Sequence, residues 1–255
     1  MSFAPRVRAA TRAAAVHFLL SLLVALAAAG LVLGLWYPFP YWESSGGKSL
    51  FLLLVSVDVV CGPLLTLVLY HPGKRRAELR LDLGLIVLIQ LSALAFGLNT
   101  VWQARPLFLV QEVDRFKVVM APDLEDEALE SLPVPLKRSW LSGPKIVSLR
   151  EPADREERNK VLFAALQGGR DYAERPEFYI PYDDAAALKS LARAKPLAVF
   201  LQKQPSQQAA AQKLATEKSA DLAQWFYLPV VARQDWVAVL DKRGQIQGFL
   251  KGDGF

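Results

Sequence analysis

The 255-residue sequence has very few of the side chains that enzymes commonly use as nucleophiles, bases or soft metal ligands. Its single cysteine, Cys61, excludes an intramolecular disulfide, so cysteine usage does not indicate a redox compartment. Both histidines, His17 and His71, precede residue 103. Residues 103–255 therefore lack a Ser–His or Cys–His pair and the usual zinc ligands, and we expect no catalysis, no metal and no cofactor.

An excess of positive charge is confined to the first part of the chain. Residues 1–102 hold eight Lys or Arg against four Asp or Glu, whereas residues 103–255 hold 22 against 21. The sequence pI near 9.3 therefore comes mainly from the first part. Such a distribution indicates loops retained in the cytoplasm and no nucleic-acid surface.

Apolar runs, in contrast, are abundant. About 20 helical residues at 1.5 Å each span the roughly 30 Å hydrocarbon core of a bilayer. We predict a membrane protein in which residues 1–102 form a membrane domain with three transmembrane α-helices near residues 16–36, 50–70 and 83–102. Residues 103–255 are predicted to form a soluble α+β domain.

A cleavable signal peptide is the alternative for the first run. The N-terminus is basic, and the small residues Ala27, Ala28 and Ala29 resemble a cleavage region. However, the run continues without a break to Trp36, which favours an uncleaved anchor.

The second run carries a carboxylate at membrane depth. An ionisable residue there costs roughly 2.5–3.5 kcal/mol on insertion scales, so Asp58 is a candidate functional residue. Gly62 opens a notch on the same helical face, and Pro63 removes a backbone donor. Asp58 either contacts a partner helix or only holds the helices in register, with Ser92 as its expected internal neighbour.

The first run contains a second small-residue feature. Gly30 and Gly34 share one helical face, because they are four residues apart, and this spacing lets another helix approach closely. The partner helix could belong to a binding protein, or the pair could serve ordinary packing within the chain.

Orientation follows from the distribution of basic residues. The second run ends in the loop motif Pro72, Gly73, Lys74, Arg75 and Arg76. The N-terminus and the longer loop from Pro72 to Arg80 hold seven of the eight basic residues of the first part. The positive-inside rule predicts a cytoplasmic N-terminus, and three spans then deliver the C-terminal domain outside, which is the periplasm for a bacterial inner membrane.

Aromatic residues surround the predicted first external loop. Trp36, Tyr37, Tyr41 and Trp42 follow the first span, and we expect them to form an interfacial aromatic belt.

The C-terminal part mixes strand and helix patterns. A hairpin is predicted at 106–120, and Asp183–Asp184 reads as a helix start rather than a catalytic carboxylate pair. Further predicted strands lie at 145–149 and 197–201, predicted helices at 123–131, 154–167, 183–194 and 206–224, and a closing meander at 227–250.

Several motifs together resemble a known family. Asp58 followed by Gly62–Leu67, the Pro72–Lys74 turn, Trp36–Pro38, Arg105–Pro106 and the Arg175–Tyr182 stretch are similar to the type IV pilin accessory proteins of the TfpX/TfpZ type. The resemblance implies an inner-membrane protein that assists the stability, assembly or surface display of a type IV pilin. Its implied partners are a pilin subunit, other pilus-assembly inner-membrane proteins and membrane lipid.

A small membrane transport or proton-coupled component that uses Asp58 is the alternative function. The sequence shows no internal repeat, whereas many transporters are built from repeated halves, so this class is less favoured.

Overall fold

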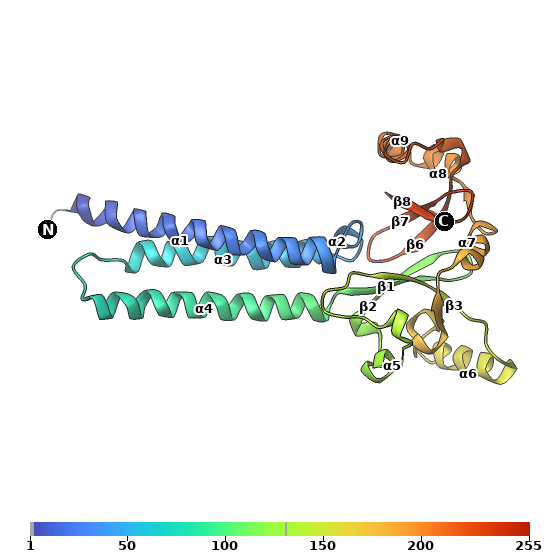
Figure 1. Ribbon diagram of the computed structural model, residues 1–255, viewed down its shortest axis with the longest axis horizontal. Coiled ribbons are helices and arrows are strands. Elements are labelled where there is room, and N and C mark those ends of the chain that lie inside the picture. The colour runs from blue at the N-terminus through green and yellow to red at the C-terminus, as the bar shows by residue number, and fades with distance from the viewer. Residues whose placement is uncertain (1–2, 131) are drawn as a thin grey trace. The chain divides into compact units, whose positions relative to one another are not determined.

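The chain forms two compact units in the computed structural model, which describes residues 3–130 and 132–255, with side chains at 6–46, 51, 55–130 and 132–255. One unit contains Met1–Trp36 and Gly47–Gln103, and it is helical. The other contains Tyr37–Gly46 and Ala104–Phe255, and it is built on a β-sheet (Figure 1). We call them the bundle and the sheet unit.

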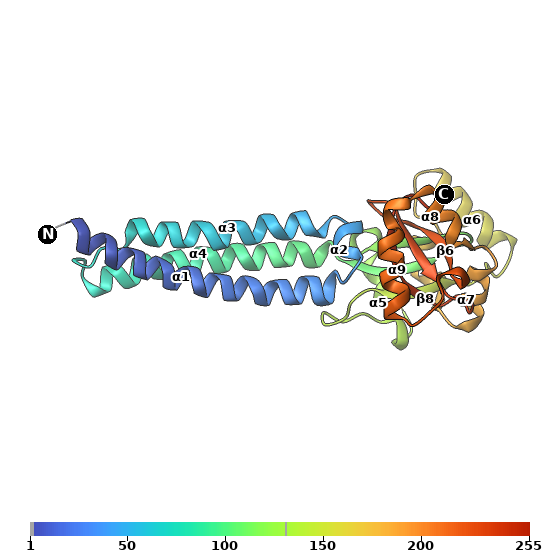
Figure 2. The same ribbon diagram turned by 90° about the horizontal axis from the view of Figure 1, so that it is seen from above.

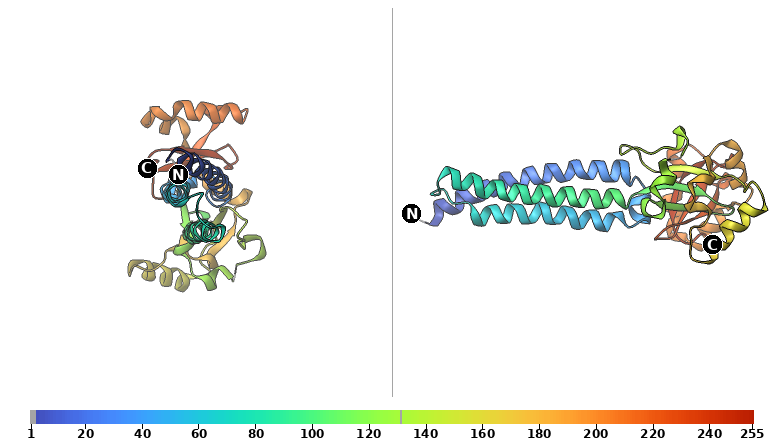
Figure 3. Two further views of the ribbon diagram at one scale, coloured as in Figure 1. Left: turned by 90° about the vertical axis from the view of Figure 1, so that its left-hand side faces the viewer. Right: turned by 90° about the horizontal axis from the view of Figure 1, so that it is seen from below.

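Three long helices make up the bundle: α1 (Phe3–Leu31), extended by the π-helical turn η1 (Val32–Trp36), α3 (Gly47–Leu69) and α4 (Arg76–Gln103). α1 and α4 each pack against α3 (Figures 2 and 3). The indole rings of Trp36 and Trp102 lie 5.0 Å apart between centroids. The ends of η1 and α4 therefore meet at one end of the bundle.

Two helices among the described residues are long and apolar enough to cross a membrane, Arg6–Trp36 and Arg76–Gln103. The described apolar part of α3, Val55–Leu69, is shorter than a span. The predicted second span is helical as far as Leu69, but the side chains at 50 and 52–54 lie outside the described residues. Length and composition thus support two of the three predicted spans.

The sheet unit has the predicted α+β class. Its eight-stranded sheet has the order β4-β3-β1-β2-β6-β7-β8, and β5 pairs with β6. The strands are β1 (Pro106–Gln111), β2 (Phe116–Met120), β3 (Lys145–Leu149), β4 (Tyr179–Pro181), β5 (Lys195–Pro196), β6 (Phe226–Val231), β7 (Trp236–Leu240) and β8 (Ile246–Lys251). The predicted hairpin, the strand at 145–149 and the closing meander are confirmed.

The direction of the strands gives the sheet two distinct ends. β1 runs parallel to β3, with Phe108 opposite Lys145, and antiparallel to β2. The starts of β1 and β3 therefore lie at one end of the sheet, together with the end of β2. We call this the entry end, because the chain reaches it directly from α4, and we call the other the far end.

Helices cover the sheet: α5 (Asp126–Glu130), α6 (Arg155–Leu166), α7 (Asp184–Leu191), α8 (Leu197–Lys203) and α9 (Gln208–Glu217). The Asp183 carboxylate accepts a hydrogen bond from the Ala186 N–H at 2.9 Å, as its prediction as a helix cap requires. The predicted helix at 206–224 is shorter, because only its central part continues as α9.

The predicted strand at 197–201 is wrong, since this segment begins α8. Leu197, Phe200 and Leu201 are buried, and their spacing of three and four residues is that of one helical face. A short apolar run does not distinguish a strand from a buried helix by periodicity alone.

The first loop does not form the expected aromatic belt. Tyr37 and Tyr41 are buried at 1% and 6% exposure, and the ring of Tyr41 belongs to the core that includes Phe116 and Trp236. Burial raises the pKa of Tyr37 to about 12, although the positive charge of Arg105 opposes the shift. The short helix α2 (Tyr41–Ser44) in this loop is therefore part of the sheet unit and not a lipid-facing segment.

Candidate functional site

Asp58 lies within the bundle, and its nearest polar neighbour comes from α4. The Gln90 amide nitrogen Nε2 donates a hydrogen bond to the main-chain oxygen of Asp58 at 2.8 Å. Gln90 also fills the notch at Gly62, where an added Cβ would stand 2.2 Å from Nε2. The Gly62 notch thus receives a helix of the same chain.

The expected neighbour Ser92 is exposed and, among the described residues, makes no hydrogen bond with Asp58. The expected partner Ser92 is only two residues from the observed partner Gln90, because the two antiparallel helices place both residues near the depth of Asp58. However, two residues rotate a helix by about 200°, so Ser92 and Gln90 lie on opposite faces. Depth could be estimated from the sequence, whereas the inward face of a helix that is apolar all round could not.

A cavity of about 180 Å³ lies beside Asp58, between the three helices. His17, Ser21, Asp58 and Gln90 are its polar lining residues, and the others are apolar. His17 Nδ1 lies 2.6 Å from the hydroxyl of Thr66, which is 1% exposed. The histidine is therefore held by α3 on one side of the cavity.

Gly30 and Gly34 differ from Gly62 in having no neighbour. A Cβ added at either position would meet nothing within 4 Å among the described residues. Among the residues whose side chains the structure describes, none packs against this face of α1 and η1.

The loop motif after α3 has a structural role that its charge alone did not reveal. The ammonium group of Lys74 donates to the Leu69 carbonyl at 3.0 Å and forms an ion pair with Asp82 at 2.6 Å. It therefore joins the last turn of α3 to the first turns of α4. The other motif residues are exposed: Pro72, Gly73, Arg75 and Arg76. Pro63 lies inside α3, which continues through it to Leu69.

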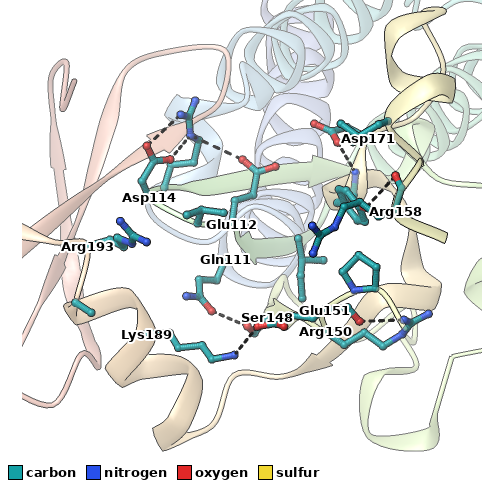
Figure 4. A pocket seen from close by; sticks show the side chains of 17 residues that line it. Gln111, Glu112, Asp114, Ser148, Arg150, Glu151, Arg158, Asp171, Lys189 and Arg193 are labelled. Carbon is teal, nitrogen blue, oxygen red and sulfur yellow. Dashed lines mark hydrogen bonds and ion pairs between the residues drawn. The ribbon is translucent and has the colours of Figure 1, made fainter. Parts of the chain in front are cut away.

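The sheet unit has a larger opening at its far end, with a volume of about 930 Å³ (Figure 4). It is bounded by the β1–β2 turn, by the residues after β3, and by side chains of α6 and the end of α7. Because β1 and β3 are parallel, their carboxyl ends both open into it. Ser148 Oγ donates to Gln111 Oε1 at 2.6 Å and links the two strands at its floor.

Charged groups dominate the lining of the far-end opening. Basic lining residues are Arg115, Arg150, Arg158, Lys189 and Arg193, and the acidic ones are Glu112, Asp114, Glu151 and Asp171. Most are paired, as Arg115 is with Asp114 at 2.8 Å. Arg158 and Arg193 form no ion pair with any described residue, so two guanidinium groups remain available to a ligand.

Burial raises the pKa of Glu112 at the edge of this opening, and the nearby Asp171 carboxylate adds to the effect. The positive charge of Lys117 opposes it, but the Lys117 ammonium is already engaged by Glu174 at 2.6 Å. The opening therefore offers fixed charges and hydrogen-bonding groups. No group of three or more potential metal ligands occurs among the described residues.

No local sequence pattern indicates the far-end opening. Its lining comes from five segments between Gln111 and Arg193. Each segment on its own reads as a turn, a strand end or a helix surface. Only the parallel pairing of β1 with β3, which joins strands separated by more than 30 residues, brings them together.

Comparisons with known proteins give one consistent result. Residues 5–46 match the family described as "Fimbrial assembly protein FimB". The chain is 37% identical over 251 residues to the fimbrial assembly proteins of serogroups I and E1 of Dichelobacter nodosus, with 96% of each chain covered. It is 44% identical over 124 residues to that of serogroups C1 and C2, covering 49% of this chain and 92% of the relative. No solved structure matches.

Proposed function

Because the chain belongs to the fimbrial assembly protein family, we propose that it is an inner-membrane accessory protein of a type IV pilus, of the TfpX/TfpZ type. In this proposal it binds a pilin subunit, assists its stability, assembly or surface display, and catalyses no reaction. The similarity over nearly the full length of the relatives supports the role in assembly. The membrane arrangement and the pilin contacts rest on the features that follow.

The shared sheet unit supports three membrane crossings. The loop Tyr37–Gly46 and residues 104–255 pack into one folded unit, so both must lie on the same side of a membrane. The chain must then cross an even number of times between Gly46 and Ala104. α4 is long enough to cross, and in the proposed arrangement α3 crosses as well. Together with the distribution of basic residues, this supports a periplasmic sheet unit.

The open glycine face and Asp58 support a contact with the pilin inside the membrane. Small residues let two helices approach closely in lipid, and Gly30 and Gly34 have no neighbour within the described chain. The Asp58 carboxylate accepts no hydrogen bond from a described side chain, although its main-chain oxygen does. The pilin head would then meet the periplasmic sheet unit, and other pilus-assembly membrane proteins and lipid would complete the surroundings.

Affinity capture tests the glycine face. We expect Gly30→Leu in a tagged full-length chain to reduce recovery of the pilin, because a bulky side chain would hold a partner helix away. Gly84→Leu is the matched control, since Gly84 of α4 also has nothing within 4 Å. Equal recovery with both variants would exclude the glycine face as the pilin contact.

The carboxylate of Asp58 is tested separately by Asp58→Asn, which preserves size and removes the charge. We expect this variant to insert normally and to support less piliation than the wild type. Normal insertion with full piliation would leave Asp58 with the register role only.

Reporter fusions test the membrane arrangement. Alkaline phosphatase fused after Phe255 should be active, and the same enzyme inserted near Arg76 should be inactive. An inactive C-terminal fusion would place the sheet unit in the cytoplasm and remove the contact with the pilin head.

Transport is less favoured than pilin binding. The cavity beside Asp58, at about 180 Å³, is smaller than the roughly 300–1,000 Å³ typical of small-molecule sites. Its size suits a few water molecules next to polar side chains.

A further inference from the structure

The segment that leads into β3 lies at the entry end of the sheet. α4 ends at Gln103, and β1 begins at Pro106. Since β3 runs parallel to β1 and is in register with it, the residues just before Lys145 lie beside the start of β1. Chain connectivity alone thus places this segment close to the point where the chain leaves α4.

This segment contains an ordered turn with apolar residues at its tip. The N–H and side-chain oxygen of Ser142 both donate to the Ser139 carbonyl, at 3.1 and 2.8 Å. Trp140 and Leu141 occupy the two central positions and are 60% and 55% exposed. The Lys145 ammonium donates to the Pro135 carbonyl and closes the loop behind the turn.

Only basic residues accompany the Ser139–Ser142 turn. Between Leu132 and Leu149 the charged residues are Lys137, Arg138 and Lys145, with no Asp or Glu. An exposed indole and leucine flanked by cations form the pattern of a segment that lies in the headgroup region of an anionic bilayer.

Arg138 is poorly compensated within the chain. Its Nε and Nη2 atoms are buried and have no hydrogen-bond partner among the described residues. The guanidinium lies 5.9 Å from the centre of the Phe108 ring, and burial lowers its pKa. Its positive charge also contributes, after burial, to lowering the pKa of Arg105 to about 10. These guanidinium atoms are enclosed by the chain, so the exposed Lys137 beside the turn is the cation that a lipid phosphate can reach.

We propose that the entry end of the sheet unit binds the surface of an anionic phospholipid bilayer, with Trp140 and Leu141 inserted among the headgroups and the exposed Lys137 facing lipid phosphate. This inference rests on the proposed three-span arrangement, which places the turn next to the outer leaflet. The contact would fix the sheet unit against the membrane, so that the far-end opening faces away from the lipid.

A lipid surface fits this end better than a second protein. Two apolar side chains at the tip of one turn provide little area for a specific protein interface, which typically buries about 800 Å² per partner. A bilayer requires no shape match, and its phosphates complement the basic residues.

Depth-dependent quenching on the full-length chain in nanodiscs tests the proposal. Cys61→Ser removes the only native thiol, and Leu141→Cys then carries an environment-sensitive fluorophore. Val113→Cys is the matched control, because Val113 is 70% exposed in the β1–β2 turn at the far end. In phosphatidylglycerol discs with quencher-labelled lipid, we expect about two-fold quenching at 141, which would sit at headgroup depth, and little at 113.

Absence of quenching at 141 would overturn the lipid contact, and equal quenching in phosphatidylcholine discs would overturn the role of the cations. Hydrogen exchange of the unmodified chain provides a second measurement without substitutions. The amides of 139–142 should exchange more slowly in phosphatidylglycerol discs than in detergent, and equal exchange would also overturn the contact. Pilin capture and the phosphatase fusions report independently on the proposed function.

Discussion

The bundle and the sheet unit use the same apolar residues in opposite ways. In the bundle, Phe96, Leu81 and Val68 are 74%, 70% and 68% exposed. In the sheet unit, every residue of β1 and of β7 is buried. In the proposed membrane arrangement the difference reflects two solvents, because apolar side chains gain nothing by leaving lipid. Stability in the bundle would then come from close packing and polar contacts, and stability in the sheet unit from burial.

Several glycines show the same contrast. Gly30, Gly34 and Gly84 in the bundle meet no described atom within 4 Å, whereas Gly244 and Gly254 in the sheet unit lie against other parts of the fold. Gly62, whose notch is filled by Gln90, and Gly168, which is open, are the exceptions. Substitutions at these glycines can therefore separate the two units experimentally.

The largest expected effect is from Gly244→Ala in the turn between β7 and β8. Gly244 has a φ of +77°, and an added Cβ would stand 1.9 Å from the carbonyl oxygen of Ala187. Both strain and overlap destabilise, and we expect the sheet unit to lose about 3 kcal/mol or more of its free energy of unfolding. Pulse proteolysis of the full-length chain measures this loss.

Gly168→Ala is the control for backbone strain alone. Gly168 has a φ of +80° at the end of α6, but nothing lies within 4 Å of the added Cβ. Its cost should be about 1 kcal/mol. Equal losses for the two variants would show that the Ala187 contact is not tight.

The next largest effect concerns the loop that joins two bundle helices but packs in the sheet unit. Tyr41→Ala removes a ring that is 6% exposed among Leu109, Phe116 and Trp236, and we expect the sheet unit to lose about 3 kcal/mol. Phe39→Ala, at 59% exposure and with one ring contact to Trp236, should cost about 1 kcal/mol or less. The same proteolysis measurement compares the two variants. An unchanged free energy of unfolding in the Tyr41 variant would mean that this loop does not contribute to the core of the sheet unit.

The Tyr41 case also shows which features could be predicted from the sequence. Strands with alternating or continuous apolar residues and turn residues at their ends, such as those of the hairpin and the meander, were predicted because the signal is local. For Tyr41 the sequence predicts a lipid-facing belt, because aromatic residues next to an apolar run usually lie at a membrane interface. Its burial depends on residues more than 60 positions away, which no local pattern reveals.

The candidate site was predictable to a similar extent. Asp58, Gly62 and Gly30 could be identified from one chain segment, because a carboxylate or a paired glycine in an apolar run is unusual by itself. Their neighbours were not predictable, since the choice of Gln90 over Ser92 depends on how α4 is rotated about its axis. The far-end opening depends entirely on strand order.

The smallest expected effect comes from an exposed ion pair of the sheet unit. The guanidinium of Arg150 holds the Glu157 carboxylate by two hydrogen bonds, at 2.8 and 2.9 Å, and the Ala153 N–H adds a third at 2.6 Å. These bonds, with Arg150 contributing most, lower the pKa of Glu157 from 4.5 to about 2. Because the folded state binds this proton less readily than the unfolded chain, the pair stabilises above pH 4.5, and its contribution is lost as the pH falls towards 2.

Glu157→Gln should therefore lower the unfolding temperature of the sheet unit slightly at pH 7 and not at pH 2, with the two curves converging as the pH falls from about 4.5. Solvent screening keeps the difference small, because the ion pair lies at the surface and both side chains are partly exposed. The bundle provides the internal reference, since neither residue of the pair belongs to it and its helical signal should be the same in both proteins. A difference that persists at pH 2 would mean that Glu157 acts through packing and not through its charge.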